Sequence, residues 1–174
     1  YQMPRSAGAA GVVDAMVAGF LRAFDDDLRA AARARGLSVR EVVTIASLVE
    51  KETAHPPERP IVSAVYQNRL KIGMGLQCDP TVIYALRLAG RWNGNLTREN
   101  LRIDSPYNTY RYAGLPPGPI AAPGKASLEA AVRPSNDKYL YFVSRNDGTH
   151  VFATTLAEHN RNVQQWQVRY FRNR

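Results

Sequence analysis

The sequence predicts a mainly helical α+β fold in a single domain, with a small β-hairpin and a long loop rich in Pro, Gly and Tyr. Three observations predict this class. Apolar residues recur at helical spacing along much of the chain, two β-rich runs flank an Asn-Asp-Gly turn, and residues 103–124 show little periodicity. A length of 174 residues suits one domain. We expect residues 1–8 to be a linker and residues 9–174 to form the domain.

The first helix is expected from Gly11 to about Gly36. Its apolar residues, spaced by about one helical turn, are Val12, Met16, Phe20, Leu21, Phe24 and Leu28. The next helix begins at a capping box, in which the Ser38 hydroxyl and the Glu41 carboxylate can satisfy free backbone donors. It should run to about Thr53, because a His-Pro-Pro sequence follows.

Two shorter helices are expected after these prolines. One covers residues 59–72 and ends at the glycine that follows it. Asp79 and Pro80 have the form of an N-cap followed by proline at the first helical position, which would open a helix to about residue 88.

The rest of the chain predicts a loop, a helix, a hairpin and a terminal helix. Loops as long as residues 103–124 are usually functional or disordered, and the tyrosines within this one argue against disorder. A short helix should start at Ser127. The runs 139–143 and 150–152 then predict a hairpin, and a second capping box begins the last helix.

Composition narrows the classes of partner and site. The net charge of +8 favours a polyanionic partner, but the basic residues are spread along the chain without a nucleic-acid-binding motif, so nucleic acid is not expected. The single cysteine, Cys78, excludes an internal disulfide and a Cys-based metal site. The three histidines lack metal-ligand spacing and are expected to be structural or surface residues. We therefore expect no metal and no cofactor.

Glu52 is the leading candidate for chemistry. Helical geometry places it on the face that carries Leu48 and Val49, whereas Glu50 points elsewhere. A carboxylate directed into an apolar face is desolvated, which raises its pKa, and a general acid for glycosidic cleavage needs this near neutral pH. On geometry alone the alternative is favoured, in which Glu52 reaches solvent or pairs with an arginine at the helix end.

Several blocks of the sequence are distinctive. They are Glu50-Lys51-Glu52-Thr53, Tyr66-Gln67-Asn68-Arg69-Leu70, Ile72-Gly73-Met74, Leu76-Gln77-Cys78-Asp79-Pro80-Thr81-Val82, Tyr107-Asn108-Thr109-Tyr110, Gly114-Leu115-Pro116-Pro117-Gly118-Pro119-Ile120 and Tyr139-Leu140-Tyr141-Phe142-Val143. Together and in this order, these blocks closely resemble the YceG-like (MltG) family of endolytic peptidoglycan lytic transglycosylases. The resemblance extends over about residues 42–159.

The resemblance implies a catalytic domain in residues 9–174, with Glu52 as general acid and then base. It implies cleavage of the β-1,4 bond between N-acetylmuramic acid and N-acetylglucosamine in nascent strands, leaving 1,6-anhydro ends. The implied partners are peptidoglycan strands and peptidoglycan synthases. The implied location is the extracytoplasmic face of the bacterial cytoplasmic membrane, with a membrane anchor that we expect to be missing from this sequence.

Further residues are candidates for substrate binding. They are Asn68, Arg69, Gln77, Asp79, Tyr107, Asn108, Thr109 and Tyr110. The arginine fork suits a lactyl or peptide carboxylate, and the tyrosine-rich block combines stacking faces with amide and hydroxyl groups suited to a sugar. The alternatives are an exposed helix face, a turn with an N-cap, and a loop that packs on its own side chains.

Two other functions stay open. A hydrolytic muramidase needs a second carboxylate, for which Asp79, Glu99 and Asp104 are candidates. A non-catalytic peptidoglycan-binding module would keep the aromatic loop without needing Glu52. The sequence also departs from the family where Cys78 replaces an expected Thr, which weakens any substrate contact through that side chain.

Overall fold

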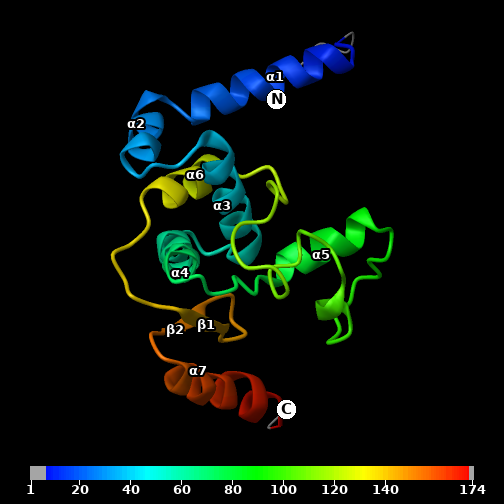
Figure 1. The fold of residues 1–174 in the computed structure, drawn as a ribbon, viewed down its shortest axis with the longest axis vertical. Coiled ribbons are helices and arrows are strands. Elements are labelled where there is room, and N and C mark those ends of the chain that lie inside the picture. Colours follow the sequence, from blue (N-terminus) through cyan, green and yellow to red (C-terminus); the bar gives the residue numbers. More distant parts are fainter. Residues whose placement is uncertain (1–6, 173–174) are drawn as a thin grey trace.

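A computed structural model describes residues 7–172 and confirms a mainly helical α+β fold with one small antiparallel sheet (Figure 1). The elements are α1 (Ala9–Ala23), α2 (Asp26–Ala34), α3 (Val39–Glu52), α4 (Arg59–Lys71), α5 (Asp79–Leu88), α6 (Lys125–Val132), β1 (Tyr141–Ser144), β2 (His150–Ala153), α7 (Leu156–Val163) and α8 (Tyr170–Arg172). Short 3-10 turns cover Pro56–Glu58 and Asn100–Arg102, and a π-helical stretch covers Gln164–Arg169. The expected linker lies almost wholly outside the described residues.

Helix α3 forms the centre of the domain and packs against α4 and α6 (Figure 1). It begins as expected, because the Glu41 carboxylate accepts from the Ser38 backbone N–H at 2.8 Å and completes the capping box. Ile45, Leu48 and Val49 are at most 1% exposed. Burial of each such side chain stabilises the fold by about 1.5–3 kcal/mol. The C-terminal turn of α3, which carries Glu52, is therefore held by a packed core.

The expected first helix is wrong in one respect, because two helices occupy residues 11–36. The chain leaves the helical conformation at Phe24, and the Asp25 side chain accepts from the Leu28 backbone N–H at 3.1 Å to cap α2. Phe24 and Leu28 turn into the core, and Phe20 packs against it. Four other apolar side chains of α1 are about half exposed, namely Val13, Met16, Val17 and Leu21. An N-cap at Asp25 thus ends a pattern that periodicity alone reads as continuous.

The expected N-cap of α5 is also wrong. Cys78 takes that position, its carbonyl accepts from the Thr81 backbone N–H at 3.0 Å, and Asp79 is the first helical residue. The Asp79 carboxylate accepts instead from the Tyr110 hydroxyl at 2.6 Å. A tertiary contact has therefore replaced the local cap that the Asp-Pro sequence suggests.

Residues 103–124 contain no helix or strand, as expected, and this loop is fixed to α3. The Ile120 backbone N–H donates to the Ser47 hydroxyl at 3.0 Å, and the Arg40 side chain donates to the Pro117 carbonyl. These long-range contacts order the loop together with local hydrogen bonds around Asn108.

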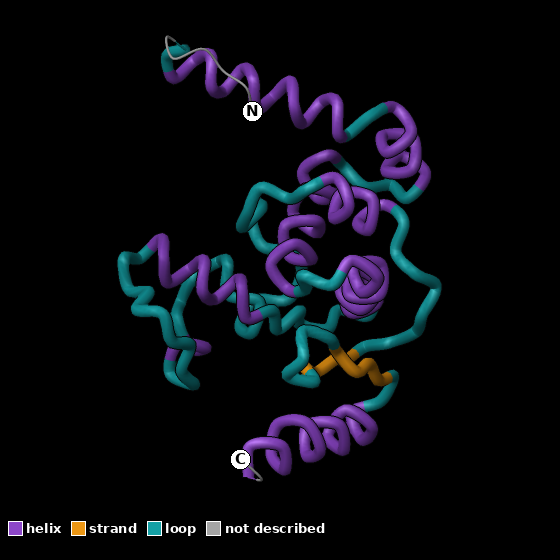
Figure 2. Tube along the Cα trace, turned by 180° about the vertical axis from the view of Figure 1, so that it is seen from behind, coloured by secondary structure: helices purple, strands orange, loops and turns teal. Residues whose placement is uncertain are grey.

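The hairpin lies between α4 and the terminal helix, as both views show (Figures 1 and 2). Its strands pair from Tyr141 with Ala153 to Ser144 with His150. Phe142 contacts Tyr66 of α4, with ring centroids 6.1 Å apart, so the hairpin brings β1 and β2 beside the core helices. Within residues 7–172, no helix has the length and apolar character needed to cross a bilayer.

Candidate active site

A cavity of about 300 Å³ lies at the C-terminal end of α3. Its wall combines α3 and α4 with the segment 76–79, the long loop, both strands of the hairpin and α7. Five of the nine site residues expected from the sequence line this cavity: Glu52, Arg69, Gln77, Asp79 and Tyr110. Residues more than 50 positions apart in the chain thus meet around one carboxyl group.

Glu52 has two hydrogen-bond donors on a single oxygen. Its Oε2 accepts from the Tyr66 hydroxyl at 2.8 Å and from the Cys78 thiol at 3.5 Å. Burial raises the pKa of Glu52, the two hydrogen bonds oppose this effect, and the nearby negative charge of Asp79 adds to it. The net pKa is raised above its ordinary value, so Glu52 stays protonated over a wider pH range. A protonated carboxyl in a cavity can serve as a general acid.

Cys78 donates to the carboxyl group of Glu52 but does not line the cavity itself. Its side chain is buried, and burial raises the pKa of its thiol well above the usual value, so it remains a neutral weak donor to Glu52. Its backbone N–H donates to the Thr109 hydroxyl at 3.0 Å. The threonine that the family resemblance leads us to expect at this position would be a stronger donor to Glu52 than the thiol is.

Arg69 ties three parts of the wall together. Its Nε donates to the Leu140 carbonyl at 2.6 Å, and its Nη1 donates to the carbonyls of Leu76 at 2.8 Å and Gly75 at 3.2 Å. The side chain is 7% exposed yet still lines the cavity. Arg69 therefore uses three of its hydrogen bonds to fix the residue that precedes β1 and the segment that precedes α5.

Gln77 and the Asp79–Tyr110 pair form an exposed part of the wall. Gln77 has a φ of 49°, in the left-handed region that non-glycine residues rarely adopt. Its backbone N–H donates to the Thr109 carbonyl at 3.1 Å, which holds this conformation. The Tyr110 hydroxyl donates to Asp79. Burial is the larger cause and this hydrogen bond the next, and both raise the pKa of Tyr110, so the phenol stays protonated.

Asn68 and Tyr107 lie away from this cavity. The Asn68 amide donates to the carbonyls of Asp137 at 2.9 Å and Tyr139 at 3.1 Å, which fixes the chain leading into β1. The Tyr107 ring packs on Tyr84, with centroids 4.8 Å apart. Their use as direct substrate contacts stays a prediction, and in this structure both act within the protein.

Asn108 and Thr109 are buried at the base of the long loop. The Asn108 amide donates to the Leu101 and Ile103 carbonyls at 3.0 and 2.8 Å. The Thr109 hydroxyl lies 2.9 Å from the Thr81 hydroxyl and receives the Cys78 N–H. Direct contact with substrate stays a prediction for both, and here they hold Tyr110 and Cys78 in position.

Two histidines that line the cavity escaped the sequence reasoning. His150 and His159 both line it, although spacing suggested only structural or surface histidines. His150 contacts Glu58, with Nδ1 and Oε2 2.7 Å apart, and His159 stacks on Tyr141 at 5.2 Å. Burial and then the charge of Arg69 lower the pKa of His159. These residues come from separate elements, so no local motif marks them.

Glu50 occupies a different environment from Glu52. Its Oε2 accepts from the Ser127 hydroxyl at 2.6 Å and from the Gly124 N–H at 3.1 Å, at the N-terminus of α6. Burial would raise the pKa of Glu50, but these hydrogen bonds outweigh burial and the pKa is lowered. Glu50 is thus an ionised helix cap, a favourable place for a negative charge.

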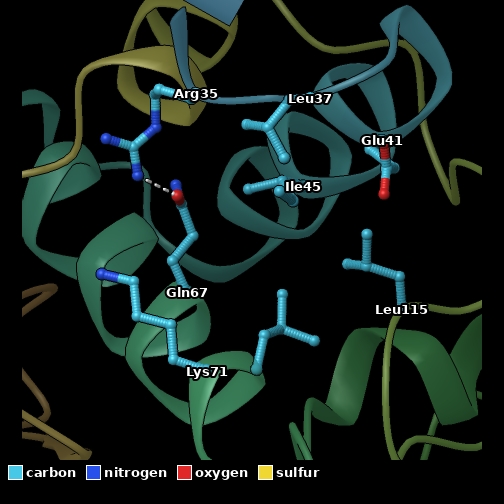
Figure 3. Close-up of a pocket in the computed structure, with 8 residues that line it drawn as sticks. Arg35, Leu37, Glu41, Ile45, Gln67, Lys71 and Leu115 are labelled. Atoms are coloured by element: carbon cyan, nitrogen blue, oxygen red, sulfur yellow. Dashed lines mark hydrogen bonds between the residues drawn. The ribbon is translucent and has the colours of Figure 1, made fainter.

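A second cavity, of about 420 Å³, lies between α3, α4 and the long loop (Figure 3). The Arg35 guanidinium donates to the Gln67 side chain at 2.6 Å on one side, and Glu41 lies on the other. Hydrogen bonds from the Ser38 hydroxyl and backbone lower the pKa of Glu41. The carboxyl group in this cavity is thus a helix-capping one with a lowered pKa, whereas the pKa of Glu52 is raised.

Comparison with known proteins places the chain in context. Residues 1–165 match the model of the YceG-like family. The chain is 47% identical over 125 residues to an endolytic murein transglycosylase of Bacillus subtilis, covering 72% of this chain and 34% of that protein. It is 34% identical over 170 residues to one of Streptococcus pneumoniae, covering 94% of this chain and 30% of that protein.

A solved structure agrees with these similarities. The crystal structure of a yceG-like protein of Listeria monocytogenes aligns with a TM-score of 0.81 at 37% identity. The alignment covers 92% of this chain and 51% of that one. The chain thus spans about a third of the length of the two curated relatives, and about half of this structural neighbour.

Proposed function

The chain belongs to the YceG-like family, and we propose that it cleaves peptidoglycan strands internally as a lytic transglycosylase, with Glu52 as its proton donor. The observation that carries the proposal is the environment of Glu52, whose pKa is raised by burial inside a polar cavity. The names of the two curated relatives supply the substrate class, because both are endolytic murein transglycosylases.

The proposed reaction uses one carboxyl group twice. Because both protein donors bind Oε2 of Glu52, the acidic proton is left on Oε1 and available to a substrate. Glu52 gives this proton to the oxygen of the β-1,4 bond as the bond to C1 of N-acetylmuramic acid breaks through an oxocarbenium-like state. The resulting carboxylate takes the proton of the C6 hydroxyl while that oxygen bonds to C1. The glycan gains a 1,6-anhydro end, no water is consumed, and Glu52 is protonated again.

Hydrolysis is the second candidate because Asp79 shares the cavity with Glu52. An inverting or retaining glycosidase needs a second carboxylate to activate water or to attack C1. Of the other candidates, Asp104 accepts from Tyr112 at 2.6 Å on an exposed surface, and Glu99 pairs with Arg102. Asp79 is therefore the residue that a hydrolytic mechanism would use.

The products distinguish these reactions. Peptidoglycan digested with the chain should yield long strands whose new ends carry 1,6-anhydromuramic acid, identified by mass and by resistance to borohydride. Glu52→Gln serves as the control. Reducing ends would establish hydrolysis and make Asp79 the second carboxylate. Strand binding without cleavage, by a folded chain, would favour the binding-module alternative.

We also propose that the protein acts at the extracytoplasmic face of the cytoplasmic membrane, alongside peptidoglycan synthases. The proposed substrate supports this location, because nascent glycan strands are found there. Fractionation of cells, followed by cross-linking of the protein to its neighbours, tests both statements. Recovery of the protein in the cytoplasm would contradict them.

A further inference from the structure

Glu58 and His150 form a buried pair beside the cavity. Glu58 ends the short turn before α4, and its side chain is 10% exposed, against 11% for the His150 side chain. Its Oε1 accepts from the His150 backbone N–H at 2.8 Å. Its Oε2 lies 2.7 Å from His150 Nδ1 and also accepts from the Thr53 hydroxyl at 3.3 Å. One carboxylate thus fixes both the backbone and the ring of His150.

This geometry selects one tautomer of the imidazole. A carboxylate can only accept, so Nδ1 of His150 carries the hydrogen. In the neutral ring, Nε2 is then a free acceptor at the end of the ring remote from Glu58. Two side-chain nitrogens of the described residues are buried without a hydrogen-bond partner, namely Arg59 Nε and His159 Nδ1. Nε2 of His150 does not belong to this group, so it is not a polar atom buried without a partner.

The ring orientation is fixed by aromatic neighbours as well. Phe142 meets the His150 ring edge to face, with centroids 5.3 Å apart, and Phe152 lies 6.3 Å away. His150 lines the same cavity as Glu52. A buried pair that only joined the hairpin to α4 would need no place in the cavity wall, whereas His150 lines the cavity and its Nε2 lies at the end of the ring that Glu58 does not hold.

We propose that His150 is a further substrate-binding residue of the catalytic cavity, whose Nε2 accepts a hydrogen bond from a hydroxyl group of the glycan. Glu58 is the positioning residue that fixes its tautomer. This inference rests on the proposed function. An acceptor at Nε2 orients a sugar hydroxyl in the cavity that also holds Glu52.

Two substitutions separate this role from a structural one. His150→Asn keeps an amide N–H near the position of Nδ1, so the contact with Glu58 can persist while Nε2 is lost. Glu58→Gln reverses the tautomer. The backbone N–H of His150 requires the Gln oxygen, so the Gln amide faces Nδ1 and donates to it, which moves the ring hydrogen to Nε2.

The experiment compares cleavage, stability and tautomer in the full chain. We expect His150→Asn to lose about tenfold in kcat/KM, the effect of one lost hydrogen bond, and Glu58→Gln to lose less, because a hydroxyl can also accept from Nε2–H. The melting temperature of both variants should stay within a few degrees. Nitrogen-15 NMR should show the hydrogen on Nδ1 of His150 in the wild type and on Nε2 in Glu58→Gln. His55→Asn, at an exposed histidine, is the matched control and should behave as the wild type.

The outcomes are separable from those of the proposed function. Wild-type cleavage by His150→Asn, or a loss fully explained by a lower melting temperature, would overturn the role of Nε2. If Glu58→Gln fails to fold, His150→Asn alone decides. If the wild type binds strands without cutting them, the proposed function fails. Calorimetry with a soluble glycan fragment then tests the contact, and equal affinity of wild type and His150→Asn would overturn it.

Discussion

The two ends of the Glu-Lys-Glu sequence show how differently one helix can use the same side chain. Glu50 reaches the N-terminus of α6, where it accepts from Ser127 and Gly124, and its pKa is lowered. Glu52 lines a cavity and accepts from Tyr66 and Cys78, and its pKa is raised. Burial raises the pKa of both groups, but Glu52 is buried far more deeply than Glu50, so burial prevails at Glu52 and the hydrogen bonds prevail at Glu50.

The difference comes from the depth of burial and from the charged and polar neighbours of each carboxylate. At Glu50 a hydroxyl and a backbone N–H near a helix N-terminus favour the charged form, and no acidic neighbour opposes them among the groups that shift its pKa. At Glu52 the donors are a buried phenol and a thiol, and Asp79 adds a negative charge. The surroundings of Glu50 therefore favour its ionised form, and those of Glu52 favour its protonated form.

The largest expected effect comes from removing each carboxyl group in turn. Glu52→Gln should lower cleavage by about 10²–10⁴-fold, because a general acid contributes that much to a rate. Glu50→Gln should keep most of the activity, since Glu50 lies outside the cavity. Initial rates of strand cleavage measure both. Full activity in Glu52→Gln, with loss in Glu50→Gln, would reverse the assignment.

A second test removes the support of the Glu52 site without touching its carboxyl. Thr109→Val keeps the shape of the side chain but leaves the buried Cys78 N–H without its partner. It also removes one contact of the Thr81 hydroxyl, which still donates to the Cys78 carbonyl at 2.6 Å. We expect unfolding to become easier by about 1–3 kcal/mol, as measured by denaturant titration. Thr97→Val, at an exposed threonine, should cost less. Equal costs would show that the Thr109 contacts contribute little.

The dependence of stability on pH should have opposite signs at the two sites. The lowered pKa of Glu50 contributes stability above its ordinary value of 4.5, which is lost as the pH falls through the folded pKa. Glu50→Gln should therefore be less stable than the wild type at neutral pH, by about 1 kcal/mol, and equal to it in acid. The raised pKa of Glu52 contributes stability below 4.5, which is lost as the pH rises through the folded pKa.

Glu52→Gln should consequently be more stable than the wild type at neutral pH and equal to it in acid. Melting curves of the three proteins between acid and neutral pH measure these differences. Stability changes of the same sign in both variants would contradict the comparison.

The smallest expected effect is a shift of the pH profile of cleavage. Activity should fall as the pH rises through the pKa of Glu52, because the general acid must be protonated. Tyr66→Phe removes a donor that lowers this pKa, so the fall should move to higher pH. Cys78→Thr supplies a stronger donor and should move it to lower pH. Unchanged profiles in both variants would show that another group controls the rate.

Local signals in the sequence were enough for most of the fold. The two capping boxes, the hairpin and the aperiodic loop are present where the sequence places them, because each depends on residues close together in the chain. The break at Asp25 was missed because the apolar spacing continues across it. The cap at Asp79 was wrong because Tyr110, 31 positions away, takes its carboxylate.

The site was predictable only in part, for the same reason. Helical spacing located Glu52 on the apolar face, and sequence motifs brought in Arg69 and Tyr110. The partners that set its chemistry come from elsewhere, since Tyr66 and Cys78 reach one oxygen from α4 and from the start of α5. Contacts between residues of separate elements leave no pattern within any one element. The sequence analysis missed His150 for the same reason.

The most direct test of the comparison is a carbon-13 NMR titration of the two side-chain carboxyl groups, assigned with Glu50→Gln and Glu52→Gln. We predict that the Glu52 carboxyl titrates above the ordinary value of 4.5 and the Glu50 carboxyl below it, within one protein and one sample. If both groups titrate on the same side of that value, or if Glu52 ionises before Glu50, then Glu52 is not held as a proton donor and the account is contradicted.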